Sequence, residues 1–225
     1  MPNRLIVAII ALVAFFMLLP EPDNASQAPN SSTAKDVAST ESDSDSNRPL
    51  KNNAEFKAGI ITDFNQNLPQ SFSLVAMGNK LAATTDKIAG GNSEVQLSLV
   101  DENQHLRLNN KSLQVSGELK PGFVYPWSGV AYLLSHKQQH GVKLSALNAL
   151  EFSAKGSLQT DKLSVLLFQV GSIKPVQQDF ELTNKWQTFQ VKFNMLNLDN
   201  ITNISFVKSQ TLGPFTFMLD DLRFK

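Results

Sequence analysis

The chain closes on the stretch Gly213-Pro214-Phe215-Thr216-Phe217-Met218-Leu219-Asp220-Asp221-Leu222-Arg223-Phe224, and this stretch decides the fold. Apolar residues occupy every second position from Phe215 to Leu219, which is the pattern of a strand with one buried face. The apolar register then shifts by one, because the next apolar residues are Leu222 and Phe224. A shift of one residue would turn these side chains to the opposite face. We therefore expect a β-bulge at Asp220-Asp221, whose extra residue keeps the whole apolar set on one face.

Short alternating segments of the same kind recur along the chain from Phe56 onward, with turn residues between them. About ten or eleven strands can be recognised, and no segment keeps a helical period over several turns. The stretch Val130–Leu134 is continuously apolar and is expected to be a strand buried on both faces. Residues 56–225 therefore predict an all-β domain, a jelly roll or β-sandwich, and its many phenylalanines suit a dry core between two sheets.

The N-terminal residues differ from the rest. Residues 1–20 contain an unbroken apolar run from Leu5 to Leu19, preceded by Arg4, which predicts a signal-anchor or a cleaved signal peptide. Residues 21–55 are rich in Ser and Asp and predict a disordered linker. The domain is thus expected to be exported: periplasmic and anchored to the inner membrane, or secreted after signal cleavage.

Charge and cysteine content exclude several classes of function. Lys+Arg and Asp+Glu both number 20, so no overall charge favours nucleic acid as a partner. Cysteine is absent, which excludes disulfides, thiolate nucleophiles and thiolate metal sites. The sequence also lacks a nucleophile elbow, a phosphate loop and a dinucleotide fingerprint, and Glu151 offers no partner for a glycosidase pair. We therefore predict a binding protein, not an enzyme.

Five blocks, in order, resemble the complex I intermediate-associated protein 30 family, with Thr85 and Ala89 replacing an Asp and a Met of the family pattern. These blocks are Thr85-Asp86-Lys87-Ile88-Ala89-Gly90-Gly91-Asn92-Ser93, Pro126-Trp127-Ser128-Gly129-Val130, Phe152-Ser153-Ala154-Lys155-Gly156, Trp186-Gln187-Thr188-Phe189-Gln190-Val191, and Gly213-Pro214-Phe215 with Asp220-Asp221-Leu222. The resemblance implies a galactose-binding-like jelly roll, similar to family 11 carbohydrate-binding modules. Mitochondrial members of the family help to assemble respiratory complex I, which implies a protein partner in an assembly role.

Two segments are candidates for ligand binding. The turn from Thr85 to Ser93 offers glycines for close backbone approach and polar side chains for hydrogen bonds, although the simpler interpretation is a turn that only joins two strands. Tyr125-Pro126-Trp127 could stack on a sugar ring or pack within its loop. Trp186, before a cleanly alternating stretch, is expected in the core. The candidate ligand-binding residues are Asp86, Gly90, Gly91, Asn92, Ser93, Tyr125 and Trp127.

A structural calcium is the only cofactor that the sequence suggests. Asp63, Asp220 and Asp221 would supply hard oxygen ligands if the first and last strands lie side by side; otherwise they only form hydrogen bonds at the bulge. His136 and His140 read as surface residues of a loop. We predict a membrane-tethered, non-catalytic domain that binds a protein partner in envelope assembly; the alternative is a carbohydrate-binding module for a cell-surface or environmental glycan.

Overall fold

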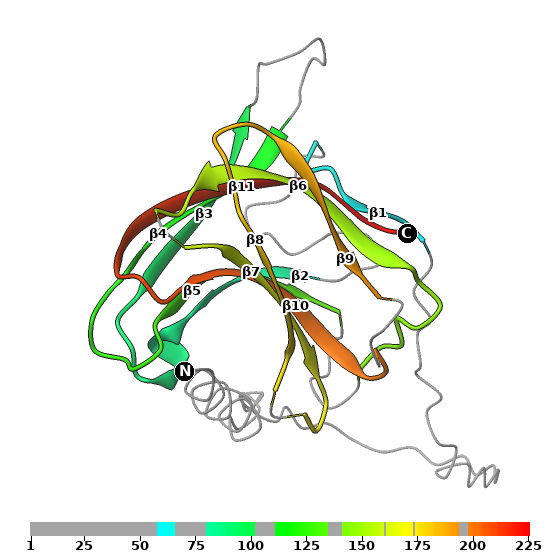
Figure 1. Cartoon of the computed structure of the whole chain (residues 1–225), viewed down its shortest axis with the longest axis horizontal. Helices are drawn as coiled ribbons and strands as arrows, with labels where there is room; N and C mark the ends of the chain where they lie inside the picture. Colours follow the sequence, from blue (N-terminus) through cyan, green and yellow to red (C-terminus); the bar gives the residue numbers. More distant parts are fainter. Residues whose placement is uncertain are drawn as a thin grey trace, which may run out of the picture.

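The computed structural model describes residues 58–65, 80–101, 111–134, 141–159, 161–172, 174–193 and 198–225. These residues form two antiparallel sheets packed face to face, which confirms the predicted all-β, jelly-roll-like sandwich (Figure 1). Among them, no helix is long and apolar enough to cross a membrane. The anchor, the linker, His136 and His140 lie outside the described residues, so what the sequence indicates for them stays a prediction.

One sheet has six strands and the other has five. The six-stranded sheet has the order β3(Glu94–Asp101), β4(Lys111–Leu119), β11(Gly213–Phe224), β6(Ala149–Ser157), β9(Gln187–Lys192), and β1(Gly59–Thr62) also pairs with β11. The five-stranded sheet has the order β2(Lys80–Thr85), β5(Trp127–Leu133), β10(Ile201–Ser209), β7(Leu163–Gln169), β8(Val176–Phe180). Both sheets arch in the same direction, so the outer face of the five-stranded sheet lies on the inside of the curve (Figure 1).

The bulge predicted in β11 is present. Asp220 pairs with Ser153 of β6 and Arg223 pairs with Glu151, so two residues of β11 face a single residue of β6. Asp221 has a φ of 49°, the left-handed region in which Asp and Asn are tolerated better than most residues. The apolar set of the strand stays together and is 0–4% exposed: Phe215, Phe217, Leu219, Leu222 and Phe224.

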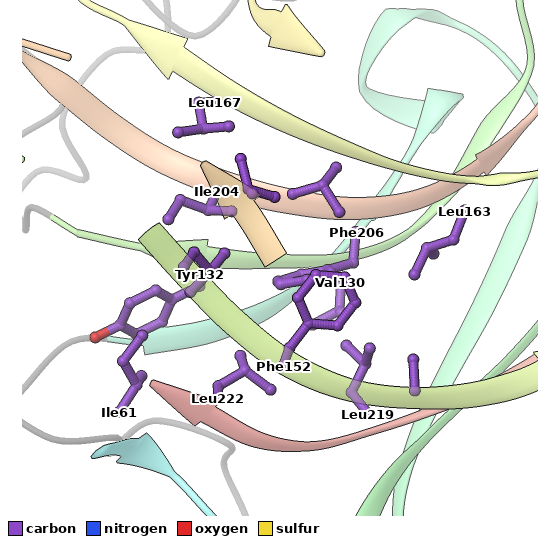
Figure 2. Packing of buried hydrophobic residues seen from close by; sticks show 14 of the residues in the cluster. Ile61, Val130, Tyr132, Phe152, Leu163, Leu167, Ile204, Phe206, Leu219 and Leu222 are labelled. Carbon is purple, nitrogen blue, oxygen red and sulfur yellow. The ribbon is translucent and has the colours of Figure 1, made fainter. Parts of the chain in front are cut away.

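The core between the sheets is centred on Phe152 of β6. Its ring lies 5.1 Å from that of Phe206 in the opposite sheet and 5.5 Å from that of Phe189 on the neighbouring strand. Figure 2 shows Phe152, Phe206 and Val130 meeting between the layers, with Leu219 and Leu222 of β11 nearby. Replacing such a phenylalanine by alanine typically lowers the free energy of unfolding by about 3–5 kcal/mol. The continuous apolar run in β5 is buried on both faces, as expected.

Five connections cross between the sheets at one end of the sandwich: β2–β3, β4–β5, β6–β7, β8–β9 and β10–β11. A buried ion pair ties two of them together, because Lys208 Nζ lies 2.7 Å from Asp161 Oδ2 and both side chains are at most 7% exposed. Asp161 also accepts hydrogen bonds from the Thr211 backbone N–H at 3.1 Å and from its hydroxyl at 2.7 Å. Lys208 Nζ donates to the Thr211 carbonyl oxygen as well.

We predict that the bulge needs a residue that tolerates positive φ. D221G and D221N should fold with a free energy of unfolding within about 1 kcal/mol of wild type, because both residues accept this conformation. D221V should be clearly less stable than D221N, since a β-branched side chain is strained there. Urea denaturation measures the three values, and equal stability of D221V and D221N would contradict the assignment.

We also predict that K208M lowers the free energy of unfolding by about 3–5 kcal/mol, because Asp161 would remain buried without its cation. The double variant K208M/D161L should recover most of this loss, since it removes both charges together. K192M, at an exposed position of β9, is the matched control and should be nearly neutral. Denaturant melts of the four proteins make the comparison, and a K208M protein as stable as K192M would refute the role of the pair.

Candidate functional site

The turn from Thr85 to Ser93 is built around a buried carboxylate. Asp86 is 0% exposed and begins the short 3-10 helix η2(Asp86–Ala89). Its Oδ1 accepts from the Ser93 backbone N–H at 2.8 Å, and its Oδ2 accepts from the Ser93 hydroxyl at 2.6 Å. A side chain at Gly91 would place its Cβ 2.3 Å from the Asp86 carboxyl carbon, so glycine is required there. Asp86, Gly91 and Ser93 are therefore buried and hold the turn, and a ligand-binding role for them stays a prediction.

Gly90 and Asn92, the other two candidate residues of this turn, also help to hold its conformation. Gly90 caps η2 with a φ of 87°, which glycine adopts without strain. The Asn92 side-chain amide donates to the carbonyl oxygen of Pro121 at 3.3 Å and so joins the turn to the β4–β5 connection. A ligand-binding role for either residue stays a prediction.

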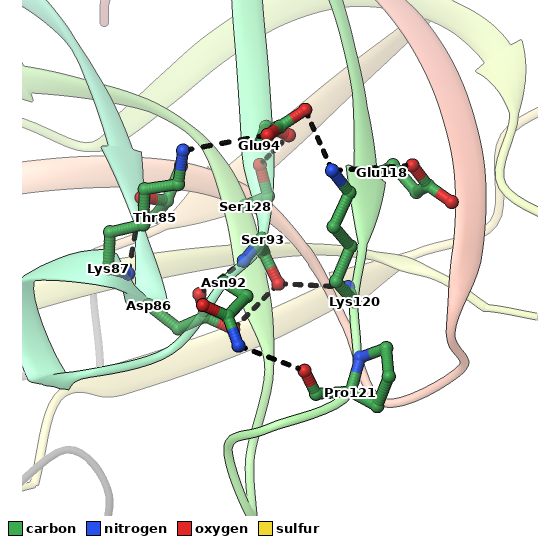
Figure 3. Close-up of polar contacts among 10 residues, drawn as sticks. All are labelled: Thr85, Asp86, Lys87, Asn92, Ser93, Glu94, Glu118, Lys120, Pro121 and Ser128. Carbon is green, nitrogen blue, oxygen red and sulfur yellow. Dashed lines mark hydrogen bonds and ion pairs between the residues drawn. The ribbon is translucent and has the colours of Figure 1, made fainter.

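A network of charged side chains covers this turn. Glu94 lies 3.0 Å from Lys120 Nζ and 3.7 Å from Lys87 Nζ, and Lys120 also lies 3.8 Å from Glu118 (Figure 3). The hydrogen bond from Lys120, and then the charges of Lys120 and Lys87, hold the pKa of Glu94 below its usual value. All four side chains are exposed or half-exposed, so the ion pairs contribute little to stability. Together the two lysines and two glutamates form a rim without net charge.

Beneath this rim is a hollow of about 600 Å³ where the open edges of the two sheets meet, which we name the edge hollow. Apolar and polar residues both contribute to it. It is lined by Ala83, Thr85, Lys87, Ile88, Ser93, Glu94, Val95, Gln96, Ser116, Gly117 and Glu118.

The outer face of the five-stranded sheet carries a second candidate surface, which we name the inner-curve face. Leu166 and Phe168 of β7 and Val207 of β10 form an apolar cluster there, separate from the main core, and Trp127 of β5 packs against it. Trp127 is half-buried, and the edge of the Phe123 ring meets it at a centroid distance of 5.6 Å and an angle of 75°. Tyr125 is half-buried in the connection that precedes Trp127.

A polar cluster lies on the same face, at the edge of the sheet. Register pairs Ser164 of β7 with Asp179 of β8 and Leu166 with Gln177, so these side chains share one face with the apolar cluster. Asp179 Oδ1 accepts from the Ser164 hydroxyl at 2.7 Å and from the Gln177 amide at 2.9 Å. Asp179 is exposed, so its carboxylate can accept further hydrogen bonds from a ligand.

One known family matches most of the chain. The model of the family described as carbohydrate binding domain 30 matches residues 66–225. The chain belongs to this family. Among curated proteins, no relative matches its sequence.

Several solved structures resemble this carbohydrate binding domain 30 member in fold. The family 11 carbohydrate-binding module of the cellulosomal cellulase Lic26A-Cel5E of Clostridium thermocellum is 14% identical, with a TM-score of 0.52 over 75% of this chain and 94% of that one. The Clostridium thermocellum family 11 module in complex with a β-1,3-1,4-mixed-linked tetrasaccharide is 14% identical, with a TM-score of 0.52 over 74% and 94%. A family 30 carbohydrate-binding module is 17% identical, with a TM-score of 0.44 over 57% and 73%.

Family membership corrects the main functional prediction. A protein partner in an envelope assembly role is wrong, because the matched family is one of carbohydrate-binding domains. The expected complex I assembly family is likewise not the family that the match shows, whereas the related expectation of a carbohydrate-module fold is confirmed. The alternative prediction, a carbohydrate-binding module, fits better.

The aromatic residues are placed differently from expectation in one case. Trp127 lies on the inner-curve face, whereas Tyr132 is 1% exposed and belongs to the core (Figure 2). The prediction that Trp186 lies in the core is wrong: it is 36% exposed, and Lys155 Nζ lies 4.9 Å above its ring. Sequence reasoning missed Ser164, Gln177 and Asp179, since only strand pairing brings these three polar residues together.

The proposed calcium ligands of this family 30 domain stand near the bulge. Asp63 follows Thr62, which pairs with Leu222, so Asp63 does lie beside the end of β11. Asp63 Oδ1 accepts from the Asn65 N–H at 3.2 Å, and Asp220 Oδ1 accepts from the Asp221 N–H at 2.7 Å. No group of three His, Asp or Glu side chains suited to a metal occurs in the part of the chain that the structure describes. Calcium binding by these residues stays a prediction.

Glu151, on the outer face of the six-stranded sheet, is held by neutral and cationic partners. Its Oε2 accepts from the Gln190 amide at 2.7 Å, and its Oε1 lies 3.1 Å from Lys225 Nζ and 3.4 Å from Arg223 Nε. The hydrogen bond from Gln190, followed by those cations, holds the pKa of Glu151 below its usual value of 4.5. A carboxyl group with a lowered pKa is ionised at neutral pH, which is unsuited to a general acid.

This cluster predicts a pH dependence of stability. Because the pKa of Glu151 is lower in the folded state, its stabilising effect is fully present above the usual value of 4.5 and is lost as the pH falls through the folded-state pKa. E151Q should therefore reduce the difference in free energy of unfolding between pH 7 and pH 3. Urea melts of wild type and E151Q at both pH values test this; an unchanged difference would contradict the pairing.

Proposed function

We propose that the inner-curve face binds a neutral polysaccharide chain and that the domain acts by binding, without catalysis. The observation that carries this proposal is the half-buried Trp127, set beside an apolar cluster and a carboxylate–amide pair, in a member of a carbohydrate-binding family. Ligand sites of this kind combine an apolar or aromatic surface with a few fixed polar groups.

Trp127 supplies the stacking surface in this proposal. The apolar C–H face of a pyranose packs well against an indole ring, which is large and loses little conformational freedom on binding. Phe123 packs edge-on against the ring and so limits its orientation. Because Trp127 is the first residue of β5, a strand and not a loop fixes its backbone.

Asp179 and Gln177 supply the hydrogen bonds. The carboxylate accepts from sugar hydroxyls, and the amide can both donate and accept. Asp179 is already oriented by Ser164 and Gln177, so little order is lost when a ligand binds. The carboxylate would also repel anionic sugars, which favours neutral glycans over uronic acid polymers.

The distance between these groups argues for an oligosaccharide. Trp127 lies on β5 and Asp179 on β8, with β10 and β7 between them. Three strand spacings amount to about 14 Å, which is longer than a single sugar ring. We therefore propose that the bound polysaccharide runs across the strands, from Trp127 to Asp179.

We predict that W127A weakens binding to soluble neutral polysaccharides by at least about tenfold, equivalent to about 1.4 kcal/mol. Affinity gel electrophoresis and calorimetry would use mixed-linked β-1,3-1,4-glucan first, then other neutral glucans and mannans, with polygalacturonate as the anionic comparison. D179N should weaken binding to neutral glycans, because the carboxylate acceptor is lost. It should also narrow the difference in affinity between neutral glycans and polygalacturonate, because the repelling charge is removed.

W186A is the matched control, because Trp186 is exposed on a different part of the domain and should leave binding unchanged. If W186A lost binding while W127A kept it, the site would not lie on the inner-curve face. No binding of the wild-type domain to any neutral polysaccharide would overturn the proposed function.

A further inference from the structure

We propose that the edge hollow is a second binding site, for a single neutral sugar unit, independent of the inner-curve face. The turn that forms one wall of it stood out in the sequence but plays no part in the inner-curve face. The hollow lies where β2 of one sheet and β3 of the other leave the sandwich open. Its volume of about 600 Å³ falls within the range of small-molecule sites.

The floor of the hollow is apolar surface that the sandwich does not cover. Ala83 pairs with Val130, which is 0% exposed in the core, so both side chains are directed to the same side of the sheet. Ala83 is nevertheless exposed, and Val95 and Ile88 beside it are only half-buried. Inward-facing apolar groups left open to solvent at the junction of two sheets provide a contact surface for the C–H face of a sugar.

The walls are fixed before any ligand arrives. The Ser128 hydroxyl of the five-stranded sheet donates to the Glu94 carbonyl oxygen of the other sheet at 2.9 Å. The Lys120 backbone N–H donates to the Ser93 hydroxyl at 3.2 Å, and Asp86 holds Ser93 from beneath (Figure 3). At Gly117, a Cβ would lie 2.2 Å from the Glu94 carbonyl oxygen and 2.8 Å from the Phe215 ring, so close packing shapes this wall too. Such pre-organisation lowers the entropy that binding would lose.

The rim selects a neutral ligand. Lys87 and Lys120 both pair with Glu94, and Lys120 also approaches Glu118, so the two cations and two anions balance. An ionic ligand would have to break these pairs. A hydroxyl group can accept from an ammonium and donate to a carboxylate at once, and so can bridge a pair without separating it.

The test uses monosaccharides, which are too short to span the inner-curve face. The ¹⁵N-labelled domain is titrated with D-glucose, D-galactose and D-mannose, and amide shifts are followed by NMR. At least one hexose should give saturable shifts at Ile88, Gln96 and Gly117. A83F should weaken this binding at least tenfold, because a phenyl ring at this small, exposed position fills the hollow. T188F, at an exposed position on the far edge strand of the six-stranded sheet, is the matched control and should change nothing.

E94Q provides a second variant that keeps the shape of the side chain and removes its charge, at little cost to stability because the ion pairs are exposed. It should weaken hexose binding several-fold. W127A should leave the hexose shifts intact, so failure of the edge hollow and failure of the inner-curve face are distinguishable. The proposal would be overturned if no hexose gave saturable shifts at the three amides, or if A83F and E94Q bound hexose as wild type does. It would also be overturned if the domain bound glycine, an ionic ligand, but none of the hexoses.

Discussion

A single inserted residue in β11 allows this strand to pair with three other strands of the six-stranded sheet. On one side, β11 pairs with β6 along its length; on the other, it pairs with β4 up to Leu219 and with β1 from Leu222 onward. The change of neighbour and the bulge occur at the same place. Without the extra residue, Leu222 and Phe224 would leave the core, and β1 would then have no apolar layer beneath it. The unusual backbone of Asp221 is thus offset by the burial of two large side chains.

Both candidate surfaces lie at the end of the sandwich where five connections cross between the sheets. Trp127 begins β5 immediately after one crossing connection, and η2 with its buried Asp86 forms another. The Asp161–Lys208 pair joins the β6–β7 connection to the end of β10. A buried ion pair adds little net stability compared with apolar packing, but it strongly penalises arrangements that separate the charges. It therefore favours one geometry at the end of the sandwich that carries both candidate surfaces.

Periodicity in the sequence was sufficient to predict the sandwich, the closing strand and its bulge, because burial on one face leaves a direct mark on the residue order. It was insufficient wherever the answer depends on which strands pair. Asp179 and Gln177 look like any outward-facing residues of an edge strand, and only the β7–β8 register shows that they share Ser164. Trp186 precedes a regular strand, yet nothing local reveals that it lies over Lys155 and not over the core. Asp86 was predicted to bind a ligand, but a buried turn carboxylate and an exposed one have the same sequence signature, so its burial could not be predicted.

The family resemblance predicted the fold but not the family, for a related reason. The glycine turn and the bulge of the closing strand serve the fold of this chain, and one fold can host different functions. Function depends instead on the residues that the fold leaves outward. Here these are a tryptophan, an amide, one carboxylate and a rim of balanced charges, in a chain whose basic and acidic residues are equal at 20 each. Surfaces of this kind give no long-range attraction to a polyanion. We propose that they recognise a neutral partner at short range, by stacking and hydrogen bonds to hydroxyl groups, both of which sugars offer.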